Sequence, residues 1–134
     1  MDCHKEKKAE NNLPSHHPIK EGKVNCASCH SPHKSLAESF EDSDSLNQNC
    51  VNCHTEKKGP FAFEHTPVVE SCLNCHKPHG SVNQNLLVNK QPTLCLQCHI
   101  IIPVEHEITS ATYKTCTSCH KSLHGSNTNA KFFN

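Results

Sequence analysis

Hydrophobic residues are spread thinly along this chain of 134 residues, in uninterrupted runs of at most three such as Ile100-Ile101-Ile102. Such runs are far too short to span a bilayer. Eight prolines and many Asn, Ser and Thr residues interrupt the segments between them, which argues against long helices or strands. We therefore predict a mostly irregular chain with short helices, one of them over residues 35–48.

The composition offers little material for an apolar core. Hydrophobic residues make up 34% of the chain, aromatic residues 4%, and tryptophan is absent. Burial of so few apolar groups does not offset the conformational entropy lost on folding, and this composition alone would indicate disorder. The 11 cysteines and 13 histidines are far above ordinary usage. A group bound to these residues is expected to replace the missing core.

The charges are balanced, with 13 basic and 13 acidic side chains. Neither nucleic acid nor a charged membrane surface is therefore expected as a partner. Residues 1–30 are polar and lack the apolar segment of a signal peptide. If the protein is exported, we expect the signal to be missing from this sequence.

Ten of the cysteines form five C-x-x-C pairs, and each pair is followed directly by histidine: CASCH, CVNCH, CLNCH, CLQCH and CTSCH. A disulfide framework leaves one of 11 cysteines over, and zinc sites built from two C-x-x-C pairs leave one pair over. Neither explains the histidine. C-x-x-C-H is instead the signature of covalent attachment of c-type haem. The expected attachment residues are Cys26, Cys29, Cys50, Cys53, Cys72, Cys75, Cys95, Cys98, Cys116 and Cys119.

The spacing of the motif has a physical reason. In a helical turn, residues i, i+3 and i+4 share one face, so both cysteines can bond one edge of a porphyrin while the histidine reaches its iron. A short helix is therefore expected at each motif, and the few apolar side chains are expected to cover the haem faces. The haems would form the core. The expected proximal iron ligands are His30, His54, His76, His99 and His120, with His4 as a sixth.

Each haem iron has a second axial position, and its ligand decides what the haem can do. The single methionine, Met1, leaves histidine as the available ligand. The candidates are His16, His17, His33, His65, His79, His106 and His124. With a second histidine on every iron, no open catalytic position and no catalytic residue is expected.

The motifs and lone histidines repeat in three units, 1–45, 46–90 and 91–134, which we interpret as diheme units. Units two and three each contain two complete motifs, a lone histidine between them, and a closing histidine three or four residues after the second motif. Unit one fits only if Cys3-His4 is a haem site that lacks its first cysteine. Six haems need twelve ligands, and thirteen histidines are present, so either His16 or His17 is spare. Five haems follow from complete motifs and six from the repeat.

The closing histidines His33 and His79 follow their motif histidine by three residues, across a proline. Three residues span at most about 10 Å, which does not bring such a histidine to the far face of its own haem. We expect each to bind a neighbouring haem instead and so to set the distance between haems. The choice between His16 and His17 stays open: the pattern H-x-P aligns His16 with His65, whereas the resemblance described next favours His17.

The segments "EHTPVVESCLNCHKPHGSVNQNLLVNKQPTLCLQCH" and "SHHPIKEGKVNCASCHSPH" resemble periplasmic multihaem cytochromes of the decahaem type, found in outer-membrane electron conduits and dimethyl-sulfoxide-reductase systems. The resemblance implies little regular structure and a close-packed row of bis-histidine haems. It also implies a periplasmic or cell-surface location, with membrane quinol-oxidising cytochromes and outer-membrane or extracellular cytochromes as partners, and porin association or self-assembly as further options. Three units stand here where that family has five.

The function expected from these observations is electron transfer through about six low-spin haems, without enzymatic activity. The protein would supply anchoring, ligation and spacing. Two alternatives are a multihaem reductase of a small nitrogen or sulfur compound, which needs an iron with an open axial position, and a subunit of a cytochrome filament.

Overall fold

A computed structural model describes residues 4–31, 33, 35, 43–101, 106 and 114–133. The prediction of a mostly irregular chain with short helices is confirmed. The α-helices are α1 (Lys5–Glu10), α3 (Ser43–Val51), α4 (Thr66–Glu70) and α5 (Thr93–Leu96). The 3-10 helices are η1 (Cys26–Ser28), η2 (Thr55–Lys57), η3 (Cys72–Asn74), η4 (Gln84–Leu86) and η6 (Cys116–Ser118). The helix expected over 35–48 is observed only from residue 43 onward, as α3; residues 36–42 lie outside the described part.

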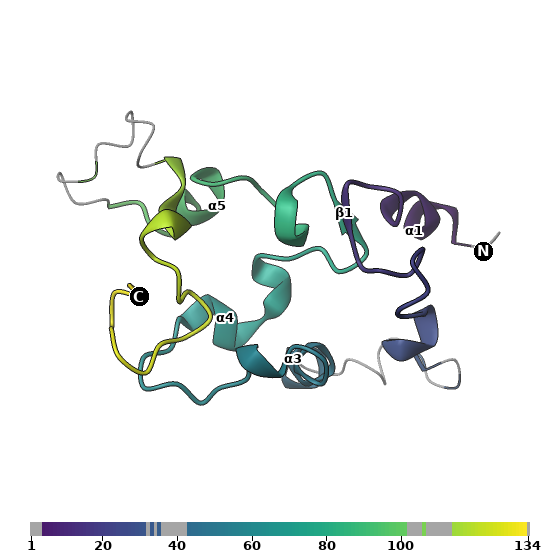
Figure 1. Cartoon of the computed structure of the whole chain (residues 1–134), viewed down its shortest axis with the longest axis horizontal. Coiled ribbons are helices and arrows are strands. Elements are labelled where there is room, and N and C mark those ends of the chain that lie inside the picture. Colours follow the sequence, from purple (N-terminus) through teal and green to yellow (C-terminus); the bar gives the residue numbers. More distant parts are fainter. Residues whose placement is uncertain are drawn as a thin grey trace.

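Two short strands join the start of the chain to its middle. β1 (Ser15–His16) pairs antiparallel with β2 (Gly80–Ser81), with Ser15 opposite Ser81 and His16 opposite Gly80. The hydroxyl of Ser15 also accepts a hydrogen bond of 2.8 Å from the backbone N–H of Leu86. In Figure 1, α1 and the β1 strand lie at one end of the molecule, and α5 and the C-terminus lie at the other.

The described residues contain no buried hydrophobic side chain. Those that are buried are polar: Asn11, Ser81, Asn83 and Ser126. Ile100 and Ile101, two of the few large apolar residues, are 86% and 91% exposed. The part of the polypeptide that the structure describes therefore has no core of the kind that stabilises ordinary domains of this size. Within the described ranges, no helix is long and apolar enough to cross a membrane.

Polar side chains link successive C-x-x-C-H motifs. In α3, the amide of Asn49 donates to the carbonyl of Cys29 at 3.2 Å, and the side-chain oxygen of Asn47 accepts from the backbone N–H of Cys72 at 2.9 Å. Further along, the side-chain oxygen of Gln91 accepts from the backbone N–H of Thr117 at 3.1 Å. These contacts join the first complete motif to the second, the second to the third, and the fourth to the fifth.

Candidate functional site

The five complete motifs share one backbone geometry. In each, the N–H of the histidine donates to the carbonyl of the first cysteine, four residues earlier, at 2.9–3.0 Å. The N–H of the second cysteine donates to the same carbonyl at 3.2–3.3 Å. Each motif is thus a single helical turn that presents two sulfur atoms and an imidazole together, as the i, i+3, i+4 spacing predicts.

Polar caps stabilise two of these turns. Asn25 accepts from the backbone N–H of Ser28 at 3.1 Å, while the hydroxyl of Ser28 accepts from the N–H of Asn25, which completes a capping box at the first motif. Ser71 caps the third motif by accepting from the N–H of Leu73 at 3.2 Å. In these two motifs, the residue directly before the first cysteine therefore caps and stabilises the turn.

The ten described cysteines are free thiols. Burial raises the pKa of Cys50 to about 11, with neighbouring Cys72 acting in the same direction. Burial also raises the pKa of Cys95 to about 12, together with a hydrogen bond to Cys116. Without a bound metal, the thiols of Cys50 and Cys95 therefore stay protonated. Among the described residues, no group of three or more His, Cys, Asp or Glu side chains is placed to hold a bare metal ion.

The histidines come together in pairs, each pairing a motif histidine with one of the lone or closing histidines. Ring centroids within a pair are 5.9–6.3 Å apart. Ring planes are 13–21° apart in four pairs and 61° apart in the fifth. The five pairs are His17–His54, His30–His79, His65–His99, His76–His124 and His106–His120.

This spacing fits an iron between the two rings. A metal–nitrogen bond is about 2 Å long and the ring centre lies about 1 Å further, so two imidazoles on opposite sides of one iron have centroids about 6 Å apart. All five separations lie close to that value, and each pair includes the histidine of a motif whose two thiols stand beside it. The residues present therefore fit c-type haem with two histidine ligands.

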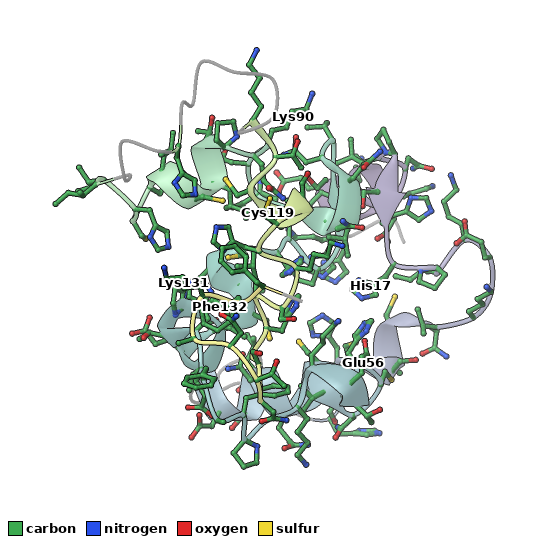
Figure 2. All side chains as sticks on the ribbon, turned by 60° about the vertical axis from the view of Figure 1, so that its left-hand side comes forward. His17, Glu56, Lys90, Cys119, Lys131 and Phe132 are labelled. Atoms are coloured by element: carbon green, nitrogen blue, oxygen red, sulfur yellow. The ribbon has the colours of Figure 1, made fainter. Side chains whose placement is uncertain are left out.

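Backbone carbonyls orient several of these imidazoles through the ring nitrogen Nδ1. The Nδ1–H of His76 donates to Asn85 at 2.8 Å, that of His120 donates to Lys131 at 2.6 Å, and that of His17 donates to Pro78. A proton held on Nδ1 leaves Nε2 with its lone pair free for a metal. Figure 2 labels His17 and Lys131, two of the residues in these contacts.

Three of the candidate distal ligands titrate at lower pH than ordinary histidines. Burial lowers the pKa of His65, His79 and His124, and neighbouring His99, Lys7 and Lys57 respectively act in the same direction. A metal-binding imidazole must be neutral. Their surroundings therefore favour the protonation state that ligation requires.

The remaining histidines differ from the five pairs. His16 is held by the carbonyl of Leu13 at 2.6 Å and by the carboxylate of Glu21 at 3.2 Å. These two hydrogen bonds raise its pKa, which favours the charged imidazolium, a form that binds no metal. His4 and His33 are exposed, and Cys3 lies outside the described residues.

Sequence reasoning did not single out several groups that contact the paired histidines. The ring centroid of Phe132, which Figure 2 labels, lies 5.5 Å from that of His65. The ring centroid of Phe133 lies 4.6 Å from that of His120. The adjacent phenylalanines Phe132 and Phe133 were the sequence feature that could have indicated these ring contacts. The carbonyls of Pro78, Asn85 and Lys131 carried none, because any residue has a carbonyl.

Residues 16–59 and 65–100 match the family model described as the doubled CXXCH motif. The chain is also 38% identical over 143 aligned residues to the multiheme cytochrome MtrA of Shewanella baltica, an alignment that covers 93% of this chain and 42% of that protein. The chain thus spans less than half the length of this relative.

Proposed function

Because the chain belongs to the doubled CXXCH family and is a multihaem c-type cytochrome of the metal-reduction conduit family, we propose that it transfers electrons along a row of six haems. The observation that carries this proposal is the set of five histidine pairs. Two histidines on an iron leave no position for a substrate, which favours electron transfer over catalysis. The haems supply the one-electron iron couple.

In this proposal the motif histidines are the proximal ligands and their partners across each pair are the distal ligands. His17, rather than His16, serves the iron of His54, because His17 faces that ring while His16 is engaged by Leu13 and Glu21. Cys26, Cys29 and the cysteines of the other four complete motifs form the thioether links.

The three units, 1–45, 46–90 and 91–134, exchange ligands according to one rule. The lone histidine of a unit serves the first haem of the next unit, as His17 does for His54 and His65 for His99. The closing histidine serves the second haem of the preceding unit, as His79 does for His30 and His124 for His76. The expectation that a closing histidine binds a haem other than its own is supported by these distances.

The last unit has a different arrangement. His106 and His120 both belong to residues 91–134 and face each other at 6.2 Å. We assign the mirror arrangement to the first unit, where His4 and His33 are the two histidines left after the five pairs and His16 are set aside. Cys3 then anchors the sixth haem through a single thioether.

The order of the haems along the row follows the order of their motifs. Hydrogen bonds join three of the four successive pairs of complete motifs: the side chain of Asn49 donates one, and the side chains of Asn47 and Gln91 each accept one. The third and fourth motifs approach each other through Cys75 and Cys98. Burial raises the pKa of Cys75, and neighbouring Cys98 acts in the same direction. Electrons therefore pass between haems of successive motifs.

The location and partners follow from the chemistry of attachment and from the family. Periplasm or cell surface is the proposed location, and other redox proteins, membrane-bound on one side and outer-membrane or extracellular on the other, are the proposed donors and acceptors. Balanced side-chain charge gives no reason to add nucleic acid to them.

The direct test is the spin state of the iron in the intact holoprotein. Electron paramagnetic resonance should show only low-spin ferric haem, and carbon monoxide should not bind the reduced protein. A high-spin signal of about one haem per chain in the unaltered protein would instead favour the reductase alternative.

A further inference from the structure

A carboxylate faces the outer nitrogen of one paired histidine. Oε2 of Glu10 lies 3.5 Å from Nδ1 of His79, whose ring lies 5.9 Å from that of His30 with planes 13° apart. On the ligand assignment of the proposed function, on which this inference rests, we propose that Glu10 lowers the reduction potential of the haem held between His30 and His79. Glu10 acts through its ligand and is a positioning residue for that haem.

The physical basis is the charge difference between the two oxidation states. A ferric haem carries one more positive charge than a ferrous haem, so a nearby negative charge stabilises the oxidised form. A negative charge beside Nδ1 also attracts the proton on that nitrogen, which makes the imidazole a stronger electron donor to its metal. Both effects favour the ferric state and move the potential in the same direction, downward.

The fold holds Glu10 in this position. A Cβ at Gly80, the residue after His79, would lie 2.0 Å from the carbonyl oxygen of Glu10, so only glycine permits this approach. The pairing of β1 with β2, in which His16 lies opposite Gly80, holds the segment that follows α1 beside the segment that follows His79. The carbonyl of Glu10 also accepts from the N–H of Leu13 at 3.0 Å, which closes the end of α1.

Lys7 adds an opposing charge. Its ammonium group donates to both oxygens of Glu10 at 3.0 Å from one turn earlier in α1. Removal of Lys7 therefore leaves the negative charge of Glu10 without its neighbouring positive charge, and the reduction potential of this haem should fall further.

Other paired histidines have different partners on Nδ1. His17, His76 and His120 donate to neutral backbone carbonyls. The second carboxylate near a paired histidine in the described part of the chain is Glu56, whose oxygen lies 3.9 Å from Nδ1 of His54. The side chain of Glu56 is 59% exposed, compared with 36% for Glu10, so water screens the charge of Glu56 more strongly. Glu56 therefore provides a matched control.

The experiment is a spectroelectrochemical titration of full-length holoprotein carrying Glu10→Gln, Lys7→Met or Glu56→Gln. We expect Glu10→Gln to raise the reduction potential of one haem. At a fixed potential the ratio of reduced to oxidised haem should rise by about tenfold, which is equivalent to 59 mV for one electron. Lys7→Met should shift the same haem downward, and Glu56→Gln should produce a smaller change on a different haem. Potential shifts of opposite sign for Glu10→Gln and Lys7→Met indicate an effect of charge. A loss of local structure would not change the sign of the shift according to the charge that is removed.

Unchanged potentials in Glu10→Gln, or shifts of the same sign in Glu10→Gln and Lys7→Met, overturn the inference. A further variant, His79→Ala, separates this outcome from failure of the ligand assignment. If His79→Ala produces one high-spin haem while Glu10→Gln changes no potential, the assignment stands and the role of Glu10 is rejected. If His79→Ala leaves every haem low-spin, the ligand assignment itself is wrong.

Discussion

The ring of His65 lies 6.1 Å from the ring of His99, with planes 20° apart, although the two residues come from different thirds of the chain. His65 precedes the third complete motif, and His99 closes the fourth. On the proposed ligand assignment, ligands pass from one unit to another, so the units at 46–90 and 91–134 would depend on each other for complete haem sites. The three units are distinct in the sequence, whereas in the folded molecule histidine pairs such as His65–His99 join residues of different units.

The first prediction concerns this exchange between units. His124→Ala should open the iron of His76, because the two rings face each other at 6.2 Å. One high-spin haem per chain should appear by electron paramagnetic resonance, and one equivalent of carbon monoxide should bind the reduced protein.

The identity of the opened haem can be established with a second change. Adding Cys72→Ala and Cys75→Ala removes the attachment of the haem at His76, and the high-spin signal should then disappear. If the signal instead requires Cys116 and Cys119, His124 serves the haem of its own motif and the exchange rule is wrong.

Adjacent histidines provide the second prediction. His17→Ala should convert one haem to high spin, whereas His16→Ala should leave all haems low-spin, because His16 contacts Leu13 and Glu21 and His17 faces His54. The two variants change the same kind of side chain at neighbouring positions, so each is a control for the other. The reverse result would assign the iron to His16.

The third prediction concerns the number of covalent haems. The intact mass of the denatured holoprotein should correspond to six haems, and Cys3→Ser should remove one of them. Five haems in the unaltered chain would show that Cys3 forms no thioether, and the total haem content of the native protein would then decide whether His4 binds an iron at all.

A fourth prediction follows from the absence of buried hydrophobic side chains among the described residues. A chain with Cys3→Ser and with all five complete motifs changed from C-x-x-C-H to S-x-x-S-H should lack stable structure, because the haems that replace the core are missing. Circular dichroism and protease sensitivity would measure this loss. Cooperative thermal unfolding of the haem-free chain would contradict it.

Gly80 provides the fifth prediction. Gly80→Ala should destabilise the protein by about 1–3 kcal/mol, as is usual for overpacking, because the new Cβ would lie 2.0 Å from the carbonyl oxygen of Glu10. The same displacement moves the carboxylate of Glu10 away from His79, so the potential of that haem should rise. Gly22→Ala is the matched control, since a Cβ there meets no atom within 4 Å; its φ of +70° limits the comparison to the haem potentials, which should not change.

The features that the sequence could predict are local ones. The turn at each motif depends on residues within a few positions of one another, and all five motifs form it with the same hydrogen bonds. The short helices and the lack of a core also follow from composition. The candidate iron ligands could be named from the sequence because so many histidines in a short chain indicate haem ligation. That ligation remains a prediction.

The pairing of ligands lay beyond sequence reasoning because it depends on contacts between distant residues. Nothing near His79 indicates that its ring faces His30, and the H-x-P alignment selected His16, the neighbour of the histidine that faces His54. The partners on Nδ1 are equally hidden, since Asn85 contributes a carbonyl from a backbone with a φ of 56° rather than its side chain.

The proposed exchange of histidines between units would also constrain how the protein matures. If haems are attached in the order of the sequence, the iron beside His30 is in place before His79 arrives, and the iron beside His76 before His124. Each early haem would then pass through a state without its final sixth ligand, in which another histidine could bind the iron. Correct assembly would depend on ligand exchange remaining fast until the last unit is present.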